Sequence, residues 1–428
     1  MKGEILATGD EIRSGALIDS NSAYIAERLE REGVEVVRHH CVGDDLGSLT
    51  DVFQEIARRA DIALVTGGLG PTSDDRTTEA AARAAGVGLV LNADALTAIE
   101  MFFERLGRTL PPSNRKQAFF PDGSEILPNP IGTAPGFKIQ IETCTFFCLP
   151  GVPVEMRKML ASEVIPRLLS LSGGHRQISM VRTLSTFGAT ESMVGEQLSD
   201  IIADFPDIQI GYRAKFPEIQ VRLYIRGDDA AEMVNHLDTV AHRVTGRLGD
   251  RVFSSDNRSM AATVGDLLAD GKATLAVAES CTGGLISHWL TNTAGSSRYF
   301  LFSGVTYANA AKMDVLGVSE TTLASHGAVS PETVREMAAG ARRVAHATYA
   351  IATSGIAGPD GGSDEKPVGT VCVGLAGPDG VTSRQFYFPY GNRRAKKKLF
   401  AMAALDTLRR HILGMEALDV GMKKITSP

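Results

Sequence analysis

A serine at a strand-to-helix turn is the first residue of this chain whose setting suggests covalent chemistry. The apolar run Thr274–Ala278 predicts a strand and Leu285–Thr291 an amphipathic helix, so Ser280 lies in the turn between them. A serine hydroxyl is a weak nucleophile unless a neighbouring base takes its proton. The turn also offers backbone N–H groups at the start of a helix, which suit an oxyanion or a substrate phosphate. These groups belong to Thr282, Gly283 and Gly284.

A lysine and a tyrosine downstream of this turn are the candidates for the base. No histidine stands in a motif that suggests this role, whereas Tyr307 and Lys312 lie around the end of a predicted strand and the first turn of a helix. A partly buried lysine with a lowered pKa can deprotonate serine, and a tyrosine hydroxyl can relay or orient the proton. Taken singly, a solvated lysine and an amphipathic strand tyrosine are the simpler interpretations. Their occurrence together with Ser280 favours a catalytic group.

A glycine-rich segment follows the next predicted strand, Tyr349–Thr353. It comprises Ser354-Gly-Ile-Ala-Gly-Pro-Asp-Gly-Gly362 and then Lys366-Pro-Val-Gly-Thr370, which is more glycine than a simple connection needs. We interpret this segment as a loop that wraps a phosphorylated ligand, with Lys366 as a counter-charge. The last predicted helix begins with Arg393-Arg394 and Lys396-Lys-Lys398. A solvated basic face is the simpler interpretation of that start, and which arginine reaches a phosphate is left open.

A second set of polar residues follows an apolar strand in the N-terminal third. The sequence there is Thr66-Gly-Gly-Leu-Gly-Pro-Thr-Ser-Asp-Asp75, leading into a helix, which is where open α/β sheets bind ligands. The glycines let the backbone approach a phosphate closely. The carboxylates of Asp74 and Asp75 cannot bind the same pyrophosphate directly, so a divalent cation would have to bridge them. A simple turn with an aspartate capping the next helix is the alternative. The pair Asp44-Asp45 after the neighbouring strand favours the metal site.

The elements that must position these residues alternate between strand and helix. Apolar runs near 3–7, 34–42 and 61–66 alternate with helical patterns at 21–33, 46–60 and 76–85, which predicts βαβ units around a mainly parallel sheet. A helix from Pro153 to about Leu171 closes this block, and Ser172-Gly-Gly-His175 then supplies residues that interrupt secondary structure. The next block is a small α+β pattern, with helices at 191–204 and 229–248 and strands at 208–213 and 218–225. The last block opens with helix 260–270 and ends with helix 394–413. We therefore predict three domains, at 1–173, 174–255 and 256–418.

Composition narrows the class of protein further. The 428 residues carry 44 Lys+Arg against 50 Asp+Glu, a net charge of −6, so a dedicated DNA-coating protein is disfavoured. No stretch reaches the ~18 apolar residues of a membrane helix, and Glu4, Asp10 and Glu11 interrupt the position of a signal peptide. Five scattered cysteines favour neither a disulfide framework nor a zinc ribbon. We expect a cytoplasmic protein with no membrane partner and no direct nucleic-acid partner.

Five motifs in the first block together resemble the molybdopterin-binding-type domain of the CinA (competence/damage-inducible) family. They are Thr8-Gly-Asp-Glu11, Gly67-Gly-Leu-Gly-Pro-Thr-Ser-Asp-Asp75, Ser113-Asn-Arg-Lys-Gln117, Asn129-Pro-Ile-Gly-Thr-Ala-Pro-Gly136 and Leu149-Pro-Gly-Val-Pro153. The resemblance implies metal-dependent hydrolysis of ADP-ribose, with Asp44, Asp74 and Asp75 near a divalent metal ion. It also implies a set of ligand-binding residues within the motifs. These are Thr8, Gly9, Asp10, Gly67, Gly68, Gly70, Pro71, Thr72, Asn114, Lys116, Gly132, Thr133, Gly136, Pro150 and Gly151.

The last block, from about Thr263 to Leu408, resembles the C-terminal domain of the same family. That domain is a nicotinamide-nucleotide amidase, which converts nicotinamide mononucleotide to nicotinic acid mononucleotide and ammonia without a metal. The resemblance implies Ser280 as nucleophile, Lys312 as base and Tyr307 as assisting hydroxyl. It implies a pocket shaped by matching positions as well. These are Ser296, Ser297, Asn309, Ser354, Gly355, Ile356, Ala357, Gly358, Gly361, Gly362, Gly369 and Thr370.

The middle block resembles the small KH-type domain of the family. Its Phe187-Gly-Ala-Thr190 lacks the second glycine of a nucleic-acid-binding Gly-x-x-Gly loop, so a spacer or dimerisation role is favoured, and a homodimer is the family expectation. The predicted fold class is therefore α/β: a molybdopterin-binding-type α/β domain, an α+β KH-type domain and an α/β amidase domain. Three alternatives to a dual hydrolase stay open: an amidase whose N-terminal domain only binds a ligand, a molybdopterin-binding scaffold, and an accessory protein in competence or DNA damage.

Overall fold

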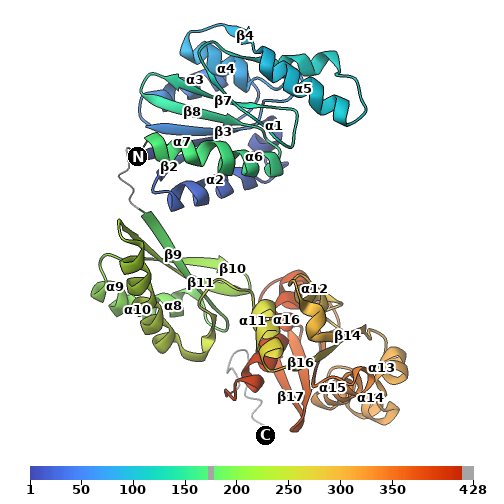
Figure 1. Ribbon diagram of the computed structural model, residues 1–428. Helices are drawn as coiled ribbons and strands as arrows, with labels where there is room; N and C mark the ends of the chain where they lie inside the picture. The colour runs from blue at the N-terminus through green and yellow to red at the C-terminus, as the bar shows by residue number, and fades with distance from the viewer. Residues whose placement is uncertain (172–177, 417–428) are drawn as a thin grey trace. The chain divides into compact units, whose positions relative to one another are not determined.

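The computed structural model describes residues 1–171 and 178–416, shown as a ribbon in Figure 1. Its contacts divide the chain into two compact units. The first holds Met1–Met180 with Arg226–Met233, and the second holds Val181–Ile225 with the residues from Val234 onward. The predicted boundary at 173/174, its breaker residues 172–175 and the predicted domain end at 418 lie outside the described residues.

The first unit is built on a sheet with strand order β2-β1-β3-β8-β7-β6. Neighbours are parallel from β2 to β8, and β7 and β6 continue the sheet antiparallel. Strand β3 is buried along its whole length because helices cover both faces of the sheet. The strands of this unit are β1 (Lys2–Thr8), β2 (Glu35–Val42), β3 (Ile62–Thr66), β6 (Glu125–Leu127), β7 (Gly136–Ile141), β8 (Cys144–Leu149) and the separate pair β4 (Leu89–Leu91) and β5 (Phe119–Pro121).

Helices form the outer two layers of this unit, as Figure 1 shows. Leu49 and Phe53 of α3 pack on one face, whereas Ile25 of α2 and Met156 and Met159 of α6 pack on the other. The helices are α1 (Asp10–Arg13), α2 (Ser20–Arg31), α3 (Leu46–Ala57), α4 (Thr77–Ala85), α5 (Ala93–Arg105), the 3₁₀ helix η1 (Pro112–Ala118), α6 (Pro153–Met159), the π-helical segment η2 (Leu160–Val164) and α7 (Ile165–Leu171). The single helix predicted over 153–171 therefore contains a π segment.

The second unit begins with a sheet of order β10-β11-β9-β12, the predicted α+β pattern. The helix predicted over 191–204 is divided, because Leu198 separates α8 from α9. The elements are β9 (Ile178–Thr186), α8 (Glu191–Gln197), α9 (Ser199–Asp204), β10 (Gln209–Lys215), β11 (Glu218–Gly227), α10 (Ala230–Leu248), η3 (Gly249–Arg251) and β12 (Val252–Ser254).

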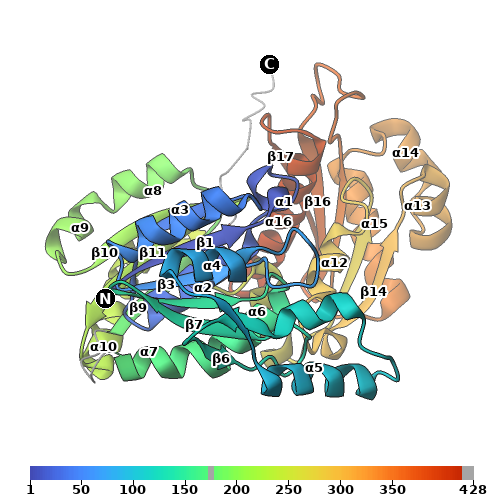
Figure 2. The same ribbon diagram turned by 90° about the horizontal axis from the view of Figure 1, so that it is seen from above.

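The second unit also holds a sheet of order β14-β13-β15-β16-β17. Strands β14, β13 and β15 are parallel, and β16 and β17 run antiparallel. Figure 2 shows α13 and α14 beside α15, which packs on one face; α11, α12 and α16 pack on the other. The elements are α11 (Met260–Asp270), β13 (Leu275–Glu279), α12 (Leu285–Thr291), η4 (Ser296–Arg298), β14 (Phe300–Val305), α13 (Asn309–Leu316), α14 (Glu320–His326), α15 (Pro331–Ala345), β15 (Tyr349–Gly355), β16 (Thr370–Gly377), β17 (Gly380–Tyr387) and α16 (Arg393–Ile412).

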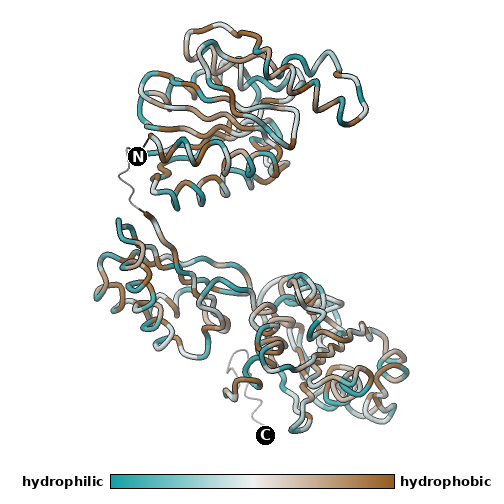
Figure 3. Tube along the Cα trace, viewed as in Figure 1, coloured by the Kyte–Doolittle hydropathy of each residue, from teal (hydrophilic) through white to brown (hydrophobic). Residues whose placement is uncertain are grey.

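The architecture confirms the predicted α/β fold class with its α+β middle part. Figure 3 shows hydrophobic residues along the central strands, where the sheets are covered by helices. Within residues 1–171 and 178–416, no helix combines the length and apolar character needed to cross a membrane.

Candidate functional site

The C-terminal candidate site lies where β13, β14 and β15 end. The amide of Ser280 donates to the carbonyl of Thr353 at 3.0 Å, and the amide of Thr306 donates to the carbonyl of Glu279 at 2.9 Å. Because parallel strands present their carboxyl ends at one edge of a sheet, three loops distant in sequence meet here. The serine turn, the segment before α13 and the glycine-rich loop therefore surround one point.

Lys312 contacts the nucleophile candidate directly. Its Nζ lies 3.3 Å from Ser280 Oγ, 3.0 Å from the carbonyl of Thr306 and 3.1 Å from the carbonyl of Tyr307. The lysine side chain is 1% exposed, and this burial lowers its pKa from the usual value because the charged form is poorly solvated. A neutral amine at this place donates its two N–H groups to the two carbonyls. Its lone pair then faces the hydroxyl of Ser280, which is the arrangement of a general base.

Glu279 is a site residue that sequence reasoning missed. Its carboxylate is fully buried and accepts hydrogen bonds from the amides of Gly284 at 2.9 Å, Ile286 at 3.3 Å and Ser287 at 3.0 Å. It also accepts from the hydroxyl of Ser287 at 2.6 Å. The start of α12 is thus occupied by the carboxylate of the chain itself. The expectation that Gly284 offers its N–H to a ligand is wrong, because Glu279 already takes that donor.

The other amides of the serine turn divide into two kinds. Gly283 donates to the carbonyl of Ser280 at 3.1 Å, so this N–H is used within the turn as well. The amide of Thr282 donates to no acceptor in the described part of the chain, and that of Cys281 contacts only its own thiol. The hydroxyl of Thr282 pairs with that of Thr353 at 2.8 Å, which ties the turn to the end of β15. The free donors next to Ser280 are therefore those of Cys281 and Thr282.

The hydroxyl of Tyr307 does not meet the Ser280–Lys312 pair. The side chain is 60% exposed, and its Oη accepts from Nη2 of Arg393 at 3.1 Å, whereas Lys312 contacts only its backbone carbonyl. Arg393 also donates from Nη1 to the carbonyl of Gly358 at 2.7 Å. The sequence interpretation named the right residue but the wrong group, since the carbonyl and not the phenol holds the lysine.

Three glycines of the 354–370 loop are explained by close approach of backbone, from the loop itself or from Phe388. A Cβ on Gly355 would lie 2.7 Å from the carbonyl oxygen of Thr370, and one on Gly362 would lie 2.8 Å from the amide of Val368. A Cβ on Gly369, which has a φ of +108°, would lie 2.2 Å from the carbonyl oxygen of Phe388. These distances leave no room for a side chain, so the loop needs glycine to fold, whatever it binds.

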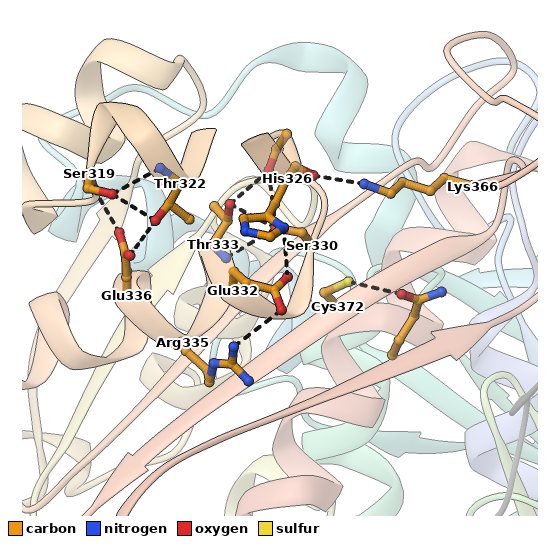
Figure 4. A network of polar contacts seen from close by, with 12 residues as sticks. Ser319, Thr322, His326, Ser330, Glu332, Thr333, Arg335, Glu336, Lys366 and Cys372 are labelled. Atoms are coloured by element: carbon orange, nitrogen blue, oxygen red, sulfur yellow. Dashed lines mark hydrogen bonds and ion pairs between the residues drawn. The ribbon is translucent and has the colours of Figure 1, made fainter. Parts of the chain in front are cut away.

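Figure 4 shows where Lys366 of this loop goes. Its Nζ donates to the carbonyl of His326 at 2.9 Å, at the end of α14. Nearby, His326 Nδ1 lies 3.8 Å from Glu332, whose carboxylate also contacts Arg335 at 3.3 Å. In the same way Ser354 donates from Oγ to the carbonyl of Ala328 at 2.6 Å. Both residues attach the loop to the segment between α14 and α15.

Two predicted pocket residues lie at the other end of the sheet. Ser296 and Ser297 stand in η4, directly before β14, where the amide of Leu275 pairs with the carbonyl of Tyr299 at 2.7 Å. This is the amino end of the parallel strands, whereas Ser280 follows the carboxyl end. Their expected place in the pocket is wrong within this chain because strand polarity separates them from Ser280. Asn309, in contrast, is exposed on the first turn of α13, close to Thr306.

The beginning of α16 adds cations to the rim of the Ser280 site. A Cβ on Gly283 would lie 3.2 Å from Nζ of Lys397, so this lysine stands over the serine turn. Arg393 lies one helical turn before Lys397 and contacts the glycine-rich loop. The interpretation of this basic run as a solvated face is therefore incomplete, and the i, i+4 spacing of Arg393 and Lys397 is the sequence signal that they share a face of the helix.

The first unit has a cavity of about 430 Å³ at the carboxyl ends of β1, β3 and β8. Most of the predicted ligand and metal residues line it. They are Thr8, Gly9, Gly67, Gly68, Gly70, Pro71, Thr133, Pro150, Gly151, Asp44, Asp74 and Asp75. Asn21, which the sequence reasoning missed, also lines it: its amide donates to the carbonyl of Gly151 at 2.7 Å, and its buried Oδ1 has no partner among the described residues.

The other predicted residues of this unit support the cavity from outside. Lys116 donates from Nζ to the carbonyls of Thr72 at 2.7 Å and Asp75 at 2.6 Å, and Asn114 donates to Gln117 at 2.8 Å. The contacts of Lys116 brace the loop after β3, and this lysine lines an adjoining pocket that shares Gly70 and Asp75 with the cavity. Six predicted ligand-binding residues do not line this cavity, and their role stays a prediction: Asp10, Thr72, Asn114, Lys116, Gly132 and Gly136.

The charged side chains at this cavity are carboxylates. They supply every charged side chain among its described lining residues, so an anionic pyrophosphate would meet only like charge there. Some are already engaged: Asp75 accepts from the amide of Thr72 at 2.9 Å, and Glu155 from Asn129 at 2.7 Å. Burial raises the pKa of Asp44, and Asp74 adds to the rise by its charge. No three metal-binding side chains form a ready cluster within the described residues, so a cation would share its ligands with the phosphates of a substrate.

Comparison with known proteins identifies all three parts of the chain. Residues 4–170 match the family described as probable molybdopterin binding domain, residues 181–254 match the damage-inducible protein CinA KH domain, and residues 257–412 match the CinA C-terminal domain. A CinA-like protein of Desulfosudis oleivorans is 52% identical over 413 residues, covering 96% of this chain and 100% of the relative. One from Desulforapulum autotrophicum is 47% identical over 417 residues, covering 96% and 99%.

A solved structure is similar to part of the chain. The crystal structure of the competence/damage inducible protein CihA from Agrobacterium tumefaciens is 40% identical, covers 35% of this chain and 92% of its own, and has a TM-score of 0.34. The full-length relatives carry the identification, because they match this chain through all three parts. The chain belongs to the CinA family.

Proposed function

We propose that the C-terminal domain is a nicotinamide-nucleotide amidase, which hydrolyses the carboxamide of nicotinamide mononucleotide to nicotinic acid mononucleotide and ammonia. The observation that carries this proposal is the 3.3 Å contact between Ser280 Oγ and Nζ of the buried Lys312. Burial keeps a larger fraction of this lysine neutral than in water, and a neutral amine can take a proton from serine.

The reaction is an acyl transfer in two stages. Ser280 Oγ attacks the carboxamide carbon while Lys312 takes the hydroxyl proton, and the tetrahedral intermediate carries its charge on the former carbonyl oxygen. The C–N bond then breaks, Lys312 returns the proton to the leaving nitrogen, and ammonia departs. Water, deprotonated by the same lysine, attacks the ester on Ser280; the C–O bond to Oγ then breaks, Lys312 returns the proton to Oγ, and the carboxylate product leaves. No metal is needed in this scheme.

Two groups of donors support the substrate in this proposal. The amides of Cys281 and Thr282, which donate to no other residue in the described part of the chain, adjoin Ser280 and supply N–H groups for the developing oxyanion. The N-terminus of α12 is filled by Glu279, so the phosphate of the nucleotide must find its counter-charge elsewhere. Arg393, exposed at the rim and oriented by Gly358 and Tyr307, is our choice for that partner.

The test is ammonia release from nicotinamide mononucleotide by the purified protein, with and without EDTA, beside Ser280→Ala. We expect release that EDTA does not change and that the variant loses. A folded protein that releases no ammonia would contradict the proposal, and release that persists in Ser280→Ala would move the nucleophile elsewhere.

For the N-terminal domain we propose metal-dependent hydrolysis of ADP-ribose to AMP and ribose 5-phosphate. The supporting observation is a cavity whose charged lining is wholly acidic within the described residues, beside a loop whose Gly67 and Gly68 have φ of +109° and +67°. A bound divalent cation would neutralise the pyrophosphate and act as a Lewis acid. Asp44, Asp74 and Asp75, which all line the cavity, would contribute ligands to it beside the oxygens of the pyrophosphate.

Turnover of ADP-ribose with Mg²⁺ or Mn²⁺, against EDTA, tests this second function. Binding of a nucleotide or a pterin without turnover would instead support a non-catalytic module, as the molybdopterin-binding name of the matching family suggests. We further propose a cytoplasmic homodimer, which sedimentation of the full chain and cell fractionation test. Association with DNA-processing proteins in the absence of nucleotide turnover would favour the accessory role in competence or DNA damage.

A further inference from the structure

A cavity of about 440 Å³ in the second unit uses none of the residues around Ser280. It lies between β17, the edge strand of the C-terminal sheet, and the second half of α16. Thr382, Arg384 and Phe386 line it from β17, because every second side chain of a strand turns to the same side. Cavities of this volume are typical of small-molecule sites.

One carboxylate lines this cavity among the described residues, and both of its oxygens are already used. Asp406 is 2% exposed; its Oδ1 accepts from Nε of Arg409 and its Oδ2 from Nε of Arg410, both at 2.8 Å. The i, i+3 and i, i+4 spacing on α16 brings the two guanidinium groups to one carboxylate. Asp250, which is half exposed, lies 3.6 Å from Nη1 of Arg410 and balances little of the remaining charge because water screens it. The buried cluster therefore carries excess positive charge.

Arg410 keeps donors for a further partner. Its side chain is 6% exposed and lines the cavity. A guanidinium has five N–H groups, and three of them donate: to Asp406 at 2.8 Å and to the carbonyls of Asp250 at 2.8 Å and Glu416 at 2.9 Å. The other two N–H groups therefore have no acceptor within hydrogen-bond distance in the described part of the chain.

Donors on the other walls are likewise unpaired. Arg384 makes no hydrogen bond or ion pair within the described residues, and the ring nitrogens of His411 make none either. The ring of His411 is held by an edge-to-face contact with Tyr349, with centroids 5.7 Å apart. The hydroxyls of Thr382 and Ser383 also lack a partner within residues 1–171 and 178–416. Two arginines, a histidine and two hydroxyls around one cavity specify an anionic ligand.

An apolar wall restricts the ligand further. Phe386 and Phe388 stack with ring centroids 6.1 Å apart, and Phe187 and Leu375 also line the cavity. An inorganic anion would leave this wall uncovered, so the anionic group belongs to a molecule with an apolar or aromatic part. A phosphate monoester carries a charge of about −1.5 to −2 at neutral pH and matches the planar fork of arginine, whereas a carboxylate carries a single charge.

We propose that this cavity binds a small phosphate monoester with an aromatic group, its phosphate among Arg384, Arg410 and His411 and its ring against Phe386. The site is independent of both proposed hydrolase reactions, since it shares no residue with the N-terminal cavity or with the groups around Ser280. Its occupant contacts the edge strand of the sheet, α16 and, through Phe187, the middle part of the chain.

Phenyl phosphate is the probe for this site. Calorimetric titration of the full-length protein should show saturable binding, and hydrogen exchange should slow in the peptides that cover 380–388 and 403–412. Inorganic phosphate, which lacks the ring, and benzoate, which carries one charge, should each bind at least about tenfold more weakly. Exchange that slows only around 280–284 would place phenyl phosphate at the Ser280 site and overturn the proposal.

A matched pair of variants tests the role of the unpaired arginine. Arg384→Met removes the guanidinium, and Arg335→Met makes the same change at an exposed position of α15 in the same unit. We expect Arg384→Met to weaken phenyl phosphate binding at least about tenfold with an unchanged unfolding temperature, because this side chain makes no polar contact within the described residues. Arg335→Met should bind as the parent does. No binding at millimolar phenyl phosphate, equal binding by Arg384→Met, or benzoate binding as tight as that of phenyl phosphate would overturn the proposal.

Discussion

Replacing Lys312 with Met tests the proposed chemistry most directly. The substitution keeps an unbranched side chain of similar length but removes the amine that lies 3.3 Å from Ser280 Oγ. General bases contribute about 10²- to 10⁴-fold to rates, so the amidase kcat should fall by that factor, about 3–5 kcal/mol in the activation free energy. KM should change little, because the substrate does not need the amine to bind.

The pH dependence of kcat/KM tests the same assignment of Lys312 as the base. The lysine acts as a base only when neutral, and burial lowers its pKa below the ordinary value, so the neutral fraction grows as the pH rises through this lowered pKa. The logarithm of kcat/KM should therefore fall with a slope of about one unit per pH unit on the acidic side of that pKa. Lys312→Met should lose this limb, since no group remains that titrates at the hydroxyl.

The stability of the variant also follows from the contacts. Met leaves the carbonyls of Thr306 and Tyr307 without their donor, which costs roughly 1–3 kcal/mol for each buried group. The loss is partly offset because the folded state no longer desolvates an amine. Because the pKa is lowered on folding, that desolvation penalty is fully present at pH values below the folded-state pKa and fades as the pH rises toward that of the unfolded chain.

The assay is ammonia release from nicotinamide mononucleotide across a pH series, with circular dichroism to show that the variant is folded. Lys158→Met, which changes an exposed lysine of α6 in the other unit, is the control for the chemical nature of the substitution. A folded Lys312→Met protein with kcat within about threefold of the parent, or one with an unchanged acidic limb, would refute the assignment of Lys312 as base.

Three further predictions follow from the same contacts. Tyr307→Phe should raise KM up to about tenfold with kcat within about threefold of the parent, because its hydroxyl orients Arg393 and does not touch Lys312; a large loss of kcat in steady-state assays would restore the phenol to the chemistry. Glu279→Gln presents an N–H to the amides of α12 and should lower the unfolding free energy by about 1–3 kcal/mol in denaturant titration; an unchanged midpoint would show that these bonds are dispensable. Asp44→Asn should abolish Mg²⁺-dependent ADP-ribose turnover and leave ammonia release intact, and turnover at the parental rate would remove Asp44 from the metal site.

The order of elements in this chain could be read from its local patterns. The helices at 260–270 and 285–291 begin and end at the predicted residues, because capping and apolar periodicity are local signals. The helix predicted over 191–204 was divided, since the turn at Leu198 is set by its tertiary packing. The antiparallel ends of the two α/β sheets were likewise not readable, because strand pairing joins residues distant in sequence.

The sequence by itself determined which groups are available for chemistry: Ser280 in a strand-to-helix turn, Lys312 at a helix start and the acidic pairs of the N-terminal third. Only the tertiary structure decided which of these groups meet. It buries Lys312 against Ser280, turns the hydroxyl of Tyr307 toward Arg393 and separates Ser296 from the site by the polarity of the strands. The physical reason is that residue types and their local spacing are properties of the chain alone. The burial of a residue, and hence its pKa and its partners, depends on segments that lie far away in the sequence and pack against it.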